Sequence, residues 1–313
     1  MSTRLQRWLS AVSDPSSVRV AASAAMGRSL MAAERRDGGA PVTSLPSPRQ
    51  EPGAPIPKII FQTWKSRDVI PENYAYWRST FAQHNPDYAL VLWDDDDNRQ
   101  FVRERFPDFL DAYNSYPREI FRADIIRLMF LYTFGGVYAD MDTECVRSLD
   151  KLRGAGDVVL GRMGRDPAFD HAIPNAIMAS KPNQGFWLLA LSLAFDRLES
   201  PEIRKTDFTS VEGPEYLTGP ILLKDAAEFY LERGPAAAFE RAAGRFGEAR
   251  AKLAHYGQIT LMEPDSLYPI NWNNPLHRIL IKRMSAAKQV IKPRQVQRLF
   301  MRSFMVTYWS HSW

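Results

Sequence analysis

The chain has 313 residues, of which 45% are hydrophobic and 24% charged, with a formal net charge of +4. This is the composition of an ordinary globular chain, long enough for one large domain with insertions or for two smaller domains. The single cysteine, Cys145, excludes an intrachain disulfide and fits a reducing compartment.

The first 56 residues differ from the rest of the chain in being rich in Ala, Ser, Arg, Pro and Gly. Prolines recur between Gly38 and Pro57, as is typical of a disordered linker. No apolar run approaches the roughly 20 residues of a membrane span, and arginines interrupt every candidate signal-peptide core. We therefore expect residues 1–56 to form a disordered or partly helical leader.

A folded domain is expected over residues 57–275, and it opens with two strand–helix units. Residues 59–61 read as a first buried strand, residues 71–84 as a helix, and residues 88–93 as a second strand. Four aspartates follow at 94–97 without the spacing or the glycine of an EF-hand. We interpret them as a strand-to-helix turn in which the last aspartate caps the next helix.

Residues 118–134 predict a helix with an apolar stripe of helical period. Asp124 and Arg127 lie three residues apart and share a face beside that stripe. One interpretation is an i,i+3 ion pair worth a few tenths of a kcal/mol. The other is a ligand site, in which Arg127 donates to phosphate or hydroxyl oxygens and Asp124 accepts from sugar hydroxyls.

The helix runs into Gly135-Gly136, which predicts a left-handed helix stop, and then into a short apolar strand over residues 137–139. Asp140 and Asp142 follow where the strand leaves the sheet. Because side chains alternate along an extended chain, we expect both carboxylates to point the same way. The carboxyl end of a strand in an open α/β sheet is where ligands bind.

Two like charges this close are unfavourable unless a cation or hydrogen-bond donors compensate them. Mg²⁺ is commonly held by one or two carboxylates together with substrate phosphates, and Mn²⁺ accepts the same oxygens. An Asp-x-Asp pair alone is also compatible with a solvated acidic turn. The preceding helix and glycine pair favour a metal at Asp140 and Asp142 that bridges the protein to a diphosphate.

Further elements follow up to residue 275. Asn175 precedes a short strand and lines the site or serves as a turn residue, and both interpretations stay open. The other expected elements are a strand at 158–161, an amphipathic helix at 182–198, a Thr-Gly-Pro turn at 218–220, a helix at 221–232, a surface helix pair at 236–255 and a late edge strand at 259–262.

The sequence FRADIIR at 121–127, followed by LYTFGGVYADMD at 131–142, resembles the signature of glycosyltransferase family 32. That family includes bacterial capsule and lipid glycosyltransferases and inositol-phosphoceramide mannosyltransferases. The resemblance implies an α/β fold of GT-A type, a single Rossmann-like mixed sheet flanked by helices. It also implies a nucleotide-sugar donor, a Mn²⁺ or Mg²⁺ ion and retention of the anomeric configuration.

The opening of the domain resembles the family pattern Pro-x-Ile-Ile-His-Gln-x-Trp. Gln62 and Trp64 match it, whereas Phe61 replaces the histidine, so no polar role is carried to that position. The resemblance implies that Gln62, Trp64 and Asn175 contact the donor, with Trp64 stacking on the nucleobase. A plain core position is the other interpretation of Trp64.

The end of the chain resembles the family pattern His-x-Trp-x-x-Ser-Trp. Trp309, Ser312 and Trp313 match, but Thr307 stands where the histidine is expected and His311 is displaced. The resemblance implies that Ser312 and Trp313 contact the diphosphate. His311 would complete the metal site if the backbone shifts, which makes Asp140, Asp142 and His311 the expected metal ligands.

Residues 276–313 are expected to form a basic amphipathic helical segment with a terminal strand or loop that closes the active site. Such a segment is typical of a membrane surface, although a solvated helix face would read the same way. No nucleic-acid module is visible. We expect a cytoplasmic protein, peripheral on the inner, anionic face of the membrane. The cations, with no acids among them, are Arg278, Lys282, Arg283, Lys288, Lys292, Arg294, Arg298 and Arg302.

Together these features predict a metal-dependent transferase that moves a hexose from GDP-mannose, UDP-glucose or UDP-galactose to a hydroxyl of a glycan or lipid-linked acceptor. Asp124, Arg127, Asp140 and Asp142 are the expected catalytic residues. A nucleotide-sugar hydrolase would use the same metal site, and a non-catalytic membrane-surface module would use only the basic tail. An Asp-x-Asp-x-Thr phosphatase is disfavoured because Glu144 stands where Thr or Val is required.

Overall fold

The computed structural model describes residues 53–200, 212–271, 274–279 and 300–310. Nearly all of the leader expected over residues 1–56 lies outside them. Residues 280–299, the greater part of the basic segment, also lie outside the described residues.

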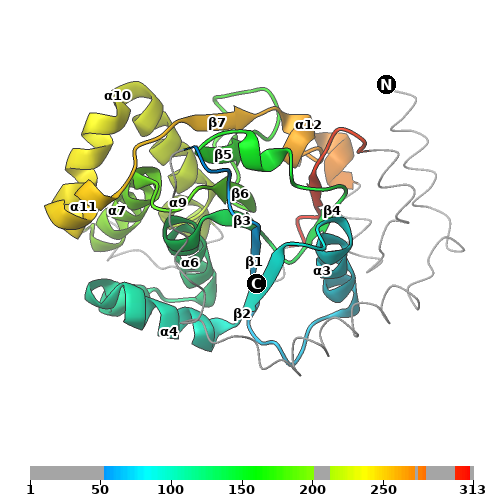
Figure 1. Cartoon of the computed structure of the whole chain (residues 1–313), viewed down its shortest axis with the longest axis horizontal. Helices are drawn as coiled ribbons and strands as arrows, with labels where there is room; N and C mark the ends of the chain where they lie inside the picture. The colour runs from blue at the N-terminus through cyan, green and yellow to red at the C-terminus, as the bar shows by residue number, and fades with distance from the viewer. Residues whose placement is uncertain (1–52, 201–211, 272–273, 280–299, 311–313) are drawn as a thin grey trace, which may run out of the picture.

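A mixed six-stranded sheet with the order β2-β1-β3-β6-β5-β7 forms the centre of the fold (Figure 1). β1 is parallel to both β2 and β3, β6 is antiparallel to β3 and β5, and β7 is parallel to β5. The predicted α/β architecture with a single mixed sheet is confirmed, and the late strand does lie at the sheet edge. The strands are β1 (Ile59–Thr63), β2 (Ala89–Trp93), β3 (Gly136–Ala139), β5 (Val158–Gly161), β6 (Ile177–Ser180) and β7 (Ile259–Met262).

Helices cover the sheet, and a small second sheet of β4 and β8 lies beside α3 and α12 (Figure 1). α6, α7 and α10 lie together on the other side of the molecule in that view. The remaining elements are α3 (Glu72–His84), α4 (Asp95–Arg105), η3 (Pro107–Phe109), α5 (Leu110–Ser115), α6 (Glu119–Phe134), β4 (Thr143–Cys145), η4 (Leu152–Gly154), α7 (Gly185–Glu199), α9 (Glu212–Leu217), α10 (Pro220–Phe246), α11 (Glu248–Leu253), α12 (Pro264–Leu267) and β8 (Met305–Thr307).

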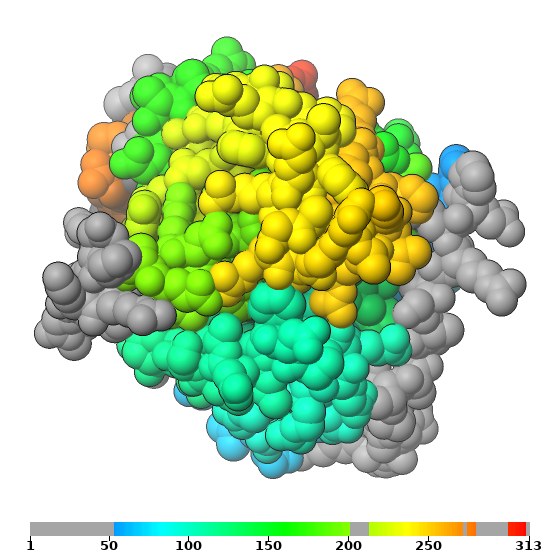
Figure 2. All heavy atoms as spheres, turned by 90° about the vertical axis from the view of Figure 1, so that its left-hand side faces the viewer, coloured from blue at the N-terminus to red at the C-terminus, as the bar shows by residue number. Residues whose placement is uncertain are grey.

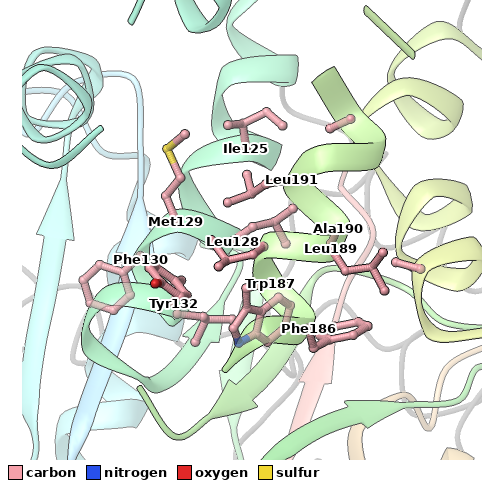
Figure 3. Packing of buried hydrophobic residues seen from close by; sticks show 14 of the residues in the cluster. Ile125, Leu128, Met129, Phe130, Tyr132, Phe186, Trp187, Leu189, Ala190 and Leu191 are labelled. Carbon is pink, nitrogen blue, oxygen red and sulfur yellow. The ribbon is translucent and has the colours of Figure 1, made fainter. Parts of the chain in front are cut away.

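α6 is buried on nearly all sides rather than along one stripe. Phe130 stacks on Phe61 of β1, with ring centroids 3.5 Å apart. On another side, Leu128 lies next to Trp187 of α7, whose indole is fully buried (Figure 3). Each large apolar side chain buried this way stabilises the fold by about 1.5–3 kcal/mol. The core therefore fixes α6, and Phe61 is a core residue where the family pattern has histidine.

α10 is broken near its middle. Gly234 has a φ of +80° inside it, and Pro235 follows with no N–H to donate. The break separates the predicted helix at 221–232 from the alanine-rich part that follows. Figure 2 shows α10 and α11 (yellow) on one face of the molecule, above the turquoise segment that includes α4.

The aspartates at 94–97 cap α4, but not in the predicted way. The Asp94 carboxylate accepts from the Asp97 N–H at 3.1 Å, and the Asp97 carboxylate accepts from the Asp94 N–H at 3.1 Å. Asp94, the first aspartate, is the N-cap, and Asp97 is its partner in a capping box. The prediction that the last aspartate caps the helix was wrong.

The glycine pair ends α6 as predicted and has positive φ at both positions, but Gly135, with a ψ of −153°, is not in the left-handed helical conformation that was expected. Gly135 has a φ of +66° and Gly136 a φ of +92°. A Cβ on Gly136 would lie 2.6 Å from the carbonyl oxygen of Ile59, and one on Gly135 would lie 2.7 Å from that of Ser180. The two glycines let the chain leave α6 and enter the sheet between β1 and β6.

Gly136→Ala is expected to lower the free energy of unfolding by about 2–4 kcal/mol, because it adds a positive-φ penalty to an overlap with β1. Urea unfolding followed by far-UV circular dichroism measures the change. Gly244→Ala is the control, since its Cβ would meet nothing within 4 Å and alanine favours a helix. Equal stability of the two variants would contradict this account of the glycine pair.

Candidate functional site

A cavity of about 280 Å³ opens beside the end of β3 and receives side chains from α6, the loop before β6, α9 and the end of the described chain. Its buried part, which we call the floor, consists of Asp124, Arg127, Asp140 and Asn175. Its more exposed part, which we call the rim, includes Arg118, Asp142, His171, Glu215 and Trp309. The structure thus brings together Asp124, Arg127, Asp140, Asp142 and Asn175, all of which were predicted from the sequence.

Arg127 lies between two carboxylates on the floor. Its Nη2 is 3.0 Å from Asp124 Oδ1, and its Nη1 is 3.2 Å from Asp140 Oδ1. Helical spacing brings Arg127 beside Asp124, and the glycine break returns the chain so that Asp140 meets the same guanidinium. The predicted ion pair between Asp124 and Arg127 is therefore confirmed, and their binding of a ligand stays a prediction.

Three further groups hold the Arg127 guanidinium. Its Nη1 donates to the carbonyl of Asn175 at 2.9 Å, its Nε donates to the carbonyl of Ala123 at 3.1 Å, and its Cζ lies 4.6 Å from the Tyr138 ring centre. Burial would lower the pKa of Arg127, but Asp140, Tyr138 and Asp124 together raise it above its ordinary value. Arg127 is therefore a fixed positive charge.

Asp124 is held from both of its oxygens. Oδ1 accepts from the Asn175 amide at 2.8 Å, and Oδ2 accepts from the Thr218 hydroxyl at 2.9 Å. Burial raises the pKa of Asp124, while Arg127, Thr218 and Asn175 oppose that rise. Asp124 fixes the floor to the Thr-Gly-Pro turn, and its contact with a sugar hydroxyl stays a prediction.

Asp140 and Asp142 are placed by a turn rather than by an extended strand. The Thr143 N–H donates to the Asp140 carbonyl at 3.1 Å, and Met141 between the two acids is buried. Strand alternation therefore does not align the two carboxylates, and this part of the prediction was wrong. Both acids still line the cavity because the turn closes beside it.

Asp140 is a buried acid with one oxygen occupied. Oδ1 accepts from the Tyr138 hydroxyl at 2.7 Å as well as pairing with Arg127. Within the described part of the chain, no protein donor reaches Oδ2. Burial raises the pKa of Asp140 to about 7, against the effect of Arg127 and with a further rise from Asp142.

Asp142 is oriented by the end of the described chain. Its Oδ2 accepts from the backbone N–H of Ser310 at 2.7 Å and from the Ser310 hydroxyl at 3.0 Å. Its Oδ1 accepts from Thr307 at 3.4 Å. Thr307, which replaces the histidine of the family pattern, thus reaches the acid pair through its hydroxyl.

A buried carboxyl, Glu144, connects the two strands behind Asp142. β4 and β8 pair antiparallel, and Glu144 on β4 accepts from the hydroxyl of Tyr308, just after β8. Its other oxygen accepts from the Tyr76 hydroxyl of α3 at 3.3 Å. Burial raises the pKa of Glu144 to about 7.

Two predicted donor-binding residues, Gln62 and Trp64, are buried and are not among the residues that line the cavity. Gln62 is fully buried, donates to the carbonyl of Asp140 at 3.3 Å and accepts from Arg78 at 2.8 Å. Trp64 is buried with its ring centre 4.8 Å from that of Tyr74. Their direct contact with a donor stays a prediction. The other predicted residues, His311, Ser312 and Trp313, lie outside the described residues.

The sequence analysis missed the contribution of Arg118, His171 and Glu215 to the cavity. His171 Nε2 lies 3.3 Å from Glu215 Oε2, although 44 positions separate them in the sequence. No spacing signal connects them, because they meet only through the packing of α9 against the loop before β6.

The donor set fits a divalent cation. Asp124 and Asp140 share the one guanidinium of Arg127, and Asp142 lines the same cavity, so carboxylates outnumber guanidiniums around the acid pair. The free Oδ2 of Asp140 and the oriented Asp142 provide hard oxygen ligands. No group of three or more His, Cys, Asp or Glu that could hold a metal occurs among the described residues. Two carboxylates suit an ion that takes its remaining ligands from a phosphate.

Most of the floor of this site lies in a part of the chain that matches a known protein-family model. Residues 71–158 match the family model described as a glycosyltransferase sugar-binding region containing a DXD motif. That stretch includes α6, the glycine break and both acids of the pair.

Several curated relatives match parts of the chain. Inositol phosphoceramide mannosyltransferase 3 of Schizosaccharomyces pombe is 46% identical over 99 residues, covering 32% of this chain and 28% of that protein. Inositol phosphoceramide mannosyltransferase 2 of the same yeast is 34% identical over 171 residues, covering 50% and 48%. A mannosyl phosphorylinositol ceramide synthase of Saccharomyces cerevisiae is 39% identical over 141 residues, covering 44% and 34%. The matched region thus spans at most about half of each relative.

Among solved structures, PaToxG Glycosyltransferase matches with a TM-score of 0.38 and 19% sequence identity. The match covers 75% of this chain and 98% of that one.

The raised pKa of Glu144 predicts a pH-dependent stability. Because the folded state holds this proton up to about pH 7 and an unfolded Glu releases it near 4.5, stability falls as the pH rises between these values. Glu144→Gln removes this dependence. Its free energy of unfolding, relative to that of the wild type, should therefore rise by about 3 kcal/mol from pH 4.5 to pH 8. Urea unfolding at both pH values measures the gain.

Glu228→Gln is the control for that measurement, because Glu228 lies on α10 with an exposed carboxylate. Its stability difference from the wild type should be the same at both pH values. A constant difference for Glu144→Gln as well would contradict the proposed titration.

Proposed function

We propose that this chain, whose residues 71–158 match the model of a glycosyltransferase sugar-binding region containing a DXD motif, transfers a hexose from a nucleotide sugar to an acceptor hydroxyl. The observation that carries the proposal is the acid pair Asp140 and Asp142 in one cavity with the buried Arg127. A non-catalytic module would have no use for an acid pair oriented by two separate segments.

We propose mannose as the sugar, with GDP-mannose as the donor and a lipid-linked polyol as the acceptor. The support is that the relatives matched over the sugar-binding region are named as mannosyltransferases acting on inositol phosphoceramide. UDP-glucose and UDP-galactose are the alternatives that a donor panel distinguishes.

A divalent cation, Mn²⁺ or Mg²⁺, would be held by Asp140 and Asp142, and when bound it supplies positive charge to the departing diphosphate. Arg127 keeps the Asp140 carboxylate in place through Oδ1 and leaves Oδ2 for the ion. Ser310 holds Asp142 from the other side. The chain therefore supplies a preorganised pair of ligands, which avoids reorganisation during the reaction.

The transfer itself needs few further groups. The acceptor oxygen bonds to the anomeric carbon while the bond from that carbon to the diphosphate oxygen breaks, and its electron pair leaves with the diphosphate. The hydroxyl proton passes to the departing diphosphate. Attack on the face from which the diphosphate leaves would retain the anomeric configuration. Arg127 and Asp124 contribute by fixing the floor against which the donor sugar lies.

We also propose that the protein works at the inner face of a membrane. Met301 and Ile279 flank residues 280–299 and have exposed fractions of 62% and 47%, with cationic Arg278 and Arg302 next to them. Among the described residues, no helix combines the length and the apolar character that a membrane crossing requires. We propose a peripheral contact, made by cations and apolar side chains together.

Asp140→Asn and Asp142→Asn are each expected to lower metal-dependent transfer by about 10²-fold or more, because charge at the diphosphate is lost. Initial rates with GDP-mannose, UDP-glucose and UDP-galactose at limiting Mn²⁺ measure the effect, with circular dichroism to verify folding. Asp111→Asn, on the exposed face of α5, is the control and should keep full activity. Full transfer by both site variants would refute the assignment, and donor breakdown without transfer would favour a hydrolase.

Reversing the charge of Arg294, Arg298 and Arg302 to Glu is expected to weaken binding to anionic vesicles, since each cation contributes about 1 kcal/mol near such a surface. Sedimentation with phosphatidylserine-containing and with phosphatidylcholine vesicles measures the difference. Unchanged sedimentation with the anionic vesicles would overturn the membrane proposal. The matched control reverses three exposed cations elsewhere, Arg103, Arg233 and Lys252.

A further inference from the structure

The cavity extends along α6, and its two ends differ in chemistry. Arg127 meets the acid pair at one end, and Arg118 lies nine positions earlier, at the start of the helix. At 1.5 Å per residue this separation is about 13 Å along the axis. Asp124 falls between them. The cavity therefore has a metal end at Asp140 and a far end at Arg118, with room for a ligand group between them.

The His171–Glu215 pair also lines this cavity. Glu215 lies three residues before Thr218, whose hydroxyl donates to Asp124 on the floor. His171 Nε2 is 3.3 Å from Glu215 Oε2, and the side chains of His171 and Glu215 are 12% and 26% exposed. The pair is thus sheltered but reachable from the cavity, and the Glu215 carboxylate can accept a hydrogen bond from a ligand hydroxyl.

Arg118 supplies a positive charge at the far end. It lies on the exposed side of the rim, with its guanidinium 5.4 Å from the Phe121 ring centre. Within the described ranges, no carboxylate lies within ion-pair distance of Arg118. A guanidinium without a carboxylate partner, facing a cavity, is suited to bind a phosphate.

We infer that the rim residues Arg118, His171 and Glu215 form the acceptor subsite, and that it takes a polyol hydroxyl with a phosphate nearby on the same molecule. The inference rests on the proposed transferase function. Glu215 accepts a hydrogen bond from a polyol hydroxyl beside the attacking one, His171 positions Glu215, and Arg118 pairs with the acceptor phosphate.

The charges of Arg118 and Glu215 favour binding of the acceptor rather than the donor at the far end of the cavity. The donor diphosphate belongs at Asp140 and Asp142, where a cation can be held, and Arg118 lies about 13 Å earlier along the axis of α6 than Arg127. A carboxylate such as Glu215 would repel a diphosphate but attracts a hydroxyl. The far end thus suits a different molecule that brings one hydroxyl and one negative charge.

The test compares transfer with donor hydrolysis, in which water replaces the acceptor. With GDP-mannose, Mn²⁺ and myo-inositol 1-phosphate, Glu215→Gln should lower the ratio of mannosyl transfer to GDP-mannose hydrolysis at least tenfold. Glu228→Gln is the matched control on α10 and should keep the wild-type ratio. An unchanged ratio for Glu215→Gln would overturn the subsite.

His171 is tested as a positioning residue. His171→Ala should raise KM for the acceptor at least fivefold, and His171→Gln, which can still donate to Glu215, should restore most of the loss. KM for GDP-mannose, measured in the same assays, reports on general damage to the site. Equal defects in both KM values, with no rescue by Gln, would show a merely structural role and overturn this part of the proposal.

Arg118 is tested with three acceptors: myo-inositol, myo-inositol 1-phosphate, and phosphatidylinositol in detergent micelles. The wild type should prefer both phosphorylated acceptors, and Arg118→Gln should reduce that preference in kcat/KM at least tenfold. Arg103→Gln, an exposed cation on α4, is the control. Preference for phosphatidylinositol alone would assign recognition to the lipid, and an undiminished preference in Arg118→Gln would exclude Arg118 as the phosphate ligand.

The wild type separates failure of the subsite from failure of the function. If it neither hydrolyses any nucleotide sugar nor transfers from one, the transferase proposal fails, and the subsite fails with it. If it hydrolyses GDP-mannose but transfers to none of the three acceptors, the function at the metal end stands and the proposed acceptor class is wrong.

Discussion

The site depends on one buried contact, the guanidinium of Arg127 held between Asp124 and Asp140. Removing these charges from water is costly, and their mutual attraction compensates only when the geometry is good and further hydrogen bonds are made. Those bonds are present, since Asn175 and Thr218 donate to Asp124, and Tyr138 donates to Asp140. Because they reach α6, β3, the loop before β6 and the turn before α10, the contact fixes the relative positions of four segments.

The same contact explains why the site suits a cation. One guanidinium cannot balance the acids around it, so burial and the charge of Asp142 leave Asp140 with a raised pKa. A divalent ion would supply the missing charge, and the departing diphosphate would share it. Asp142 is held differently, by Thr307 and Ser310, so its position depends on the pairing of β4 with β8. The two acids are two residues apart in the sequence but are held by different segments, Asp140 by α6 and Asp142 by the end of the described chain.

Much of the fold could be predicted from local patterns. The glycine pair and the adjacent strand were readable because positive φ and short apolar runs have direct sequence signatures. The turn that places Asp140 and Asp142 was missed, because alternation assumes an extended chain. The burial of α6 on all sides was also missed, since it depends on β1 and α7 packing against it. His171 and Glu215 had no signature at all, because only the tertiary fold brings them together.

The hydrogen bond from Thr218 to Asp124 connects the turn after α9 to the floor of the cavity. Thr218 begins the turn into α10, where the carbonyl of Pro214 would lie 2.9 Å from a Cβ on Gly219, so α9 and the turn are tightly packed. Glu215 on α9 therefore cannot shift far without disturbing Thr218, and a shift of Thr218 would leave an oxygen of Asp124 buried without its donor. Leaving such a group unsatisfied costs about 1–3 kcal/mol. The Asp124–Arg127 pair, which would help to hold the donor, thus also restrains Glu215, the carboxylate that would receive the acceptor.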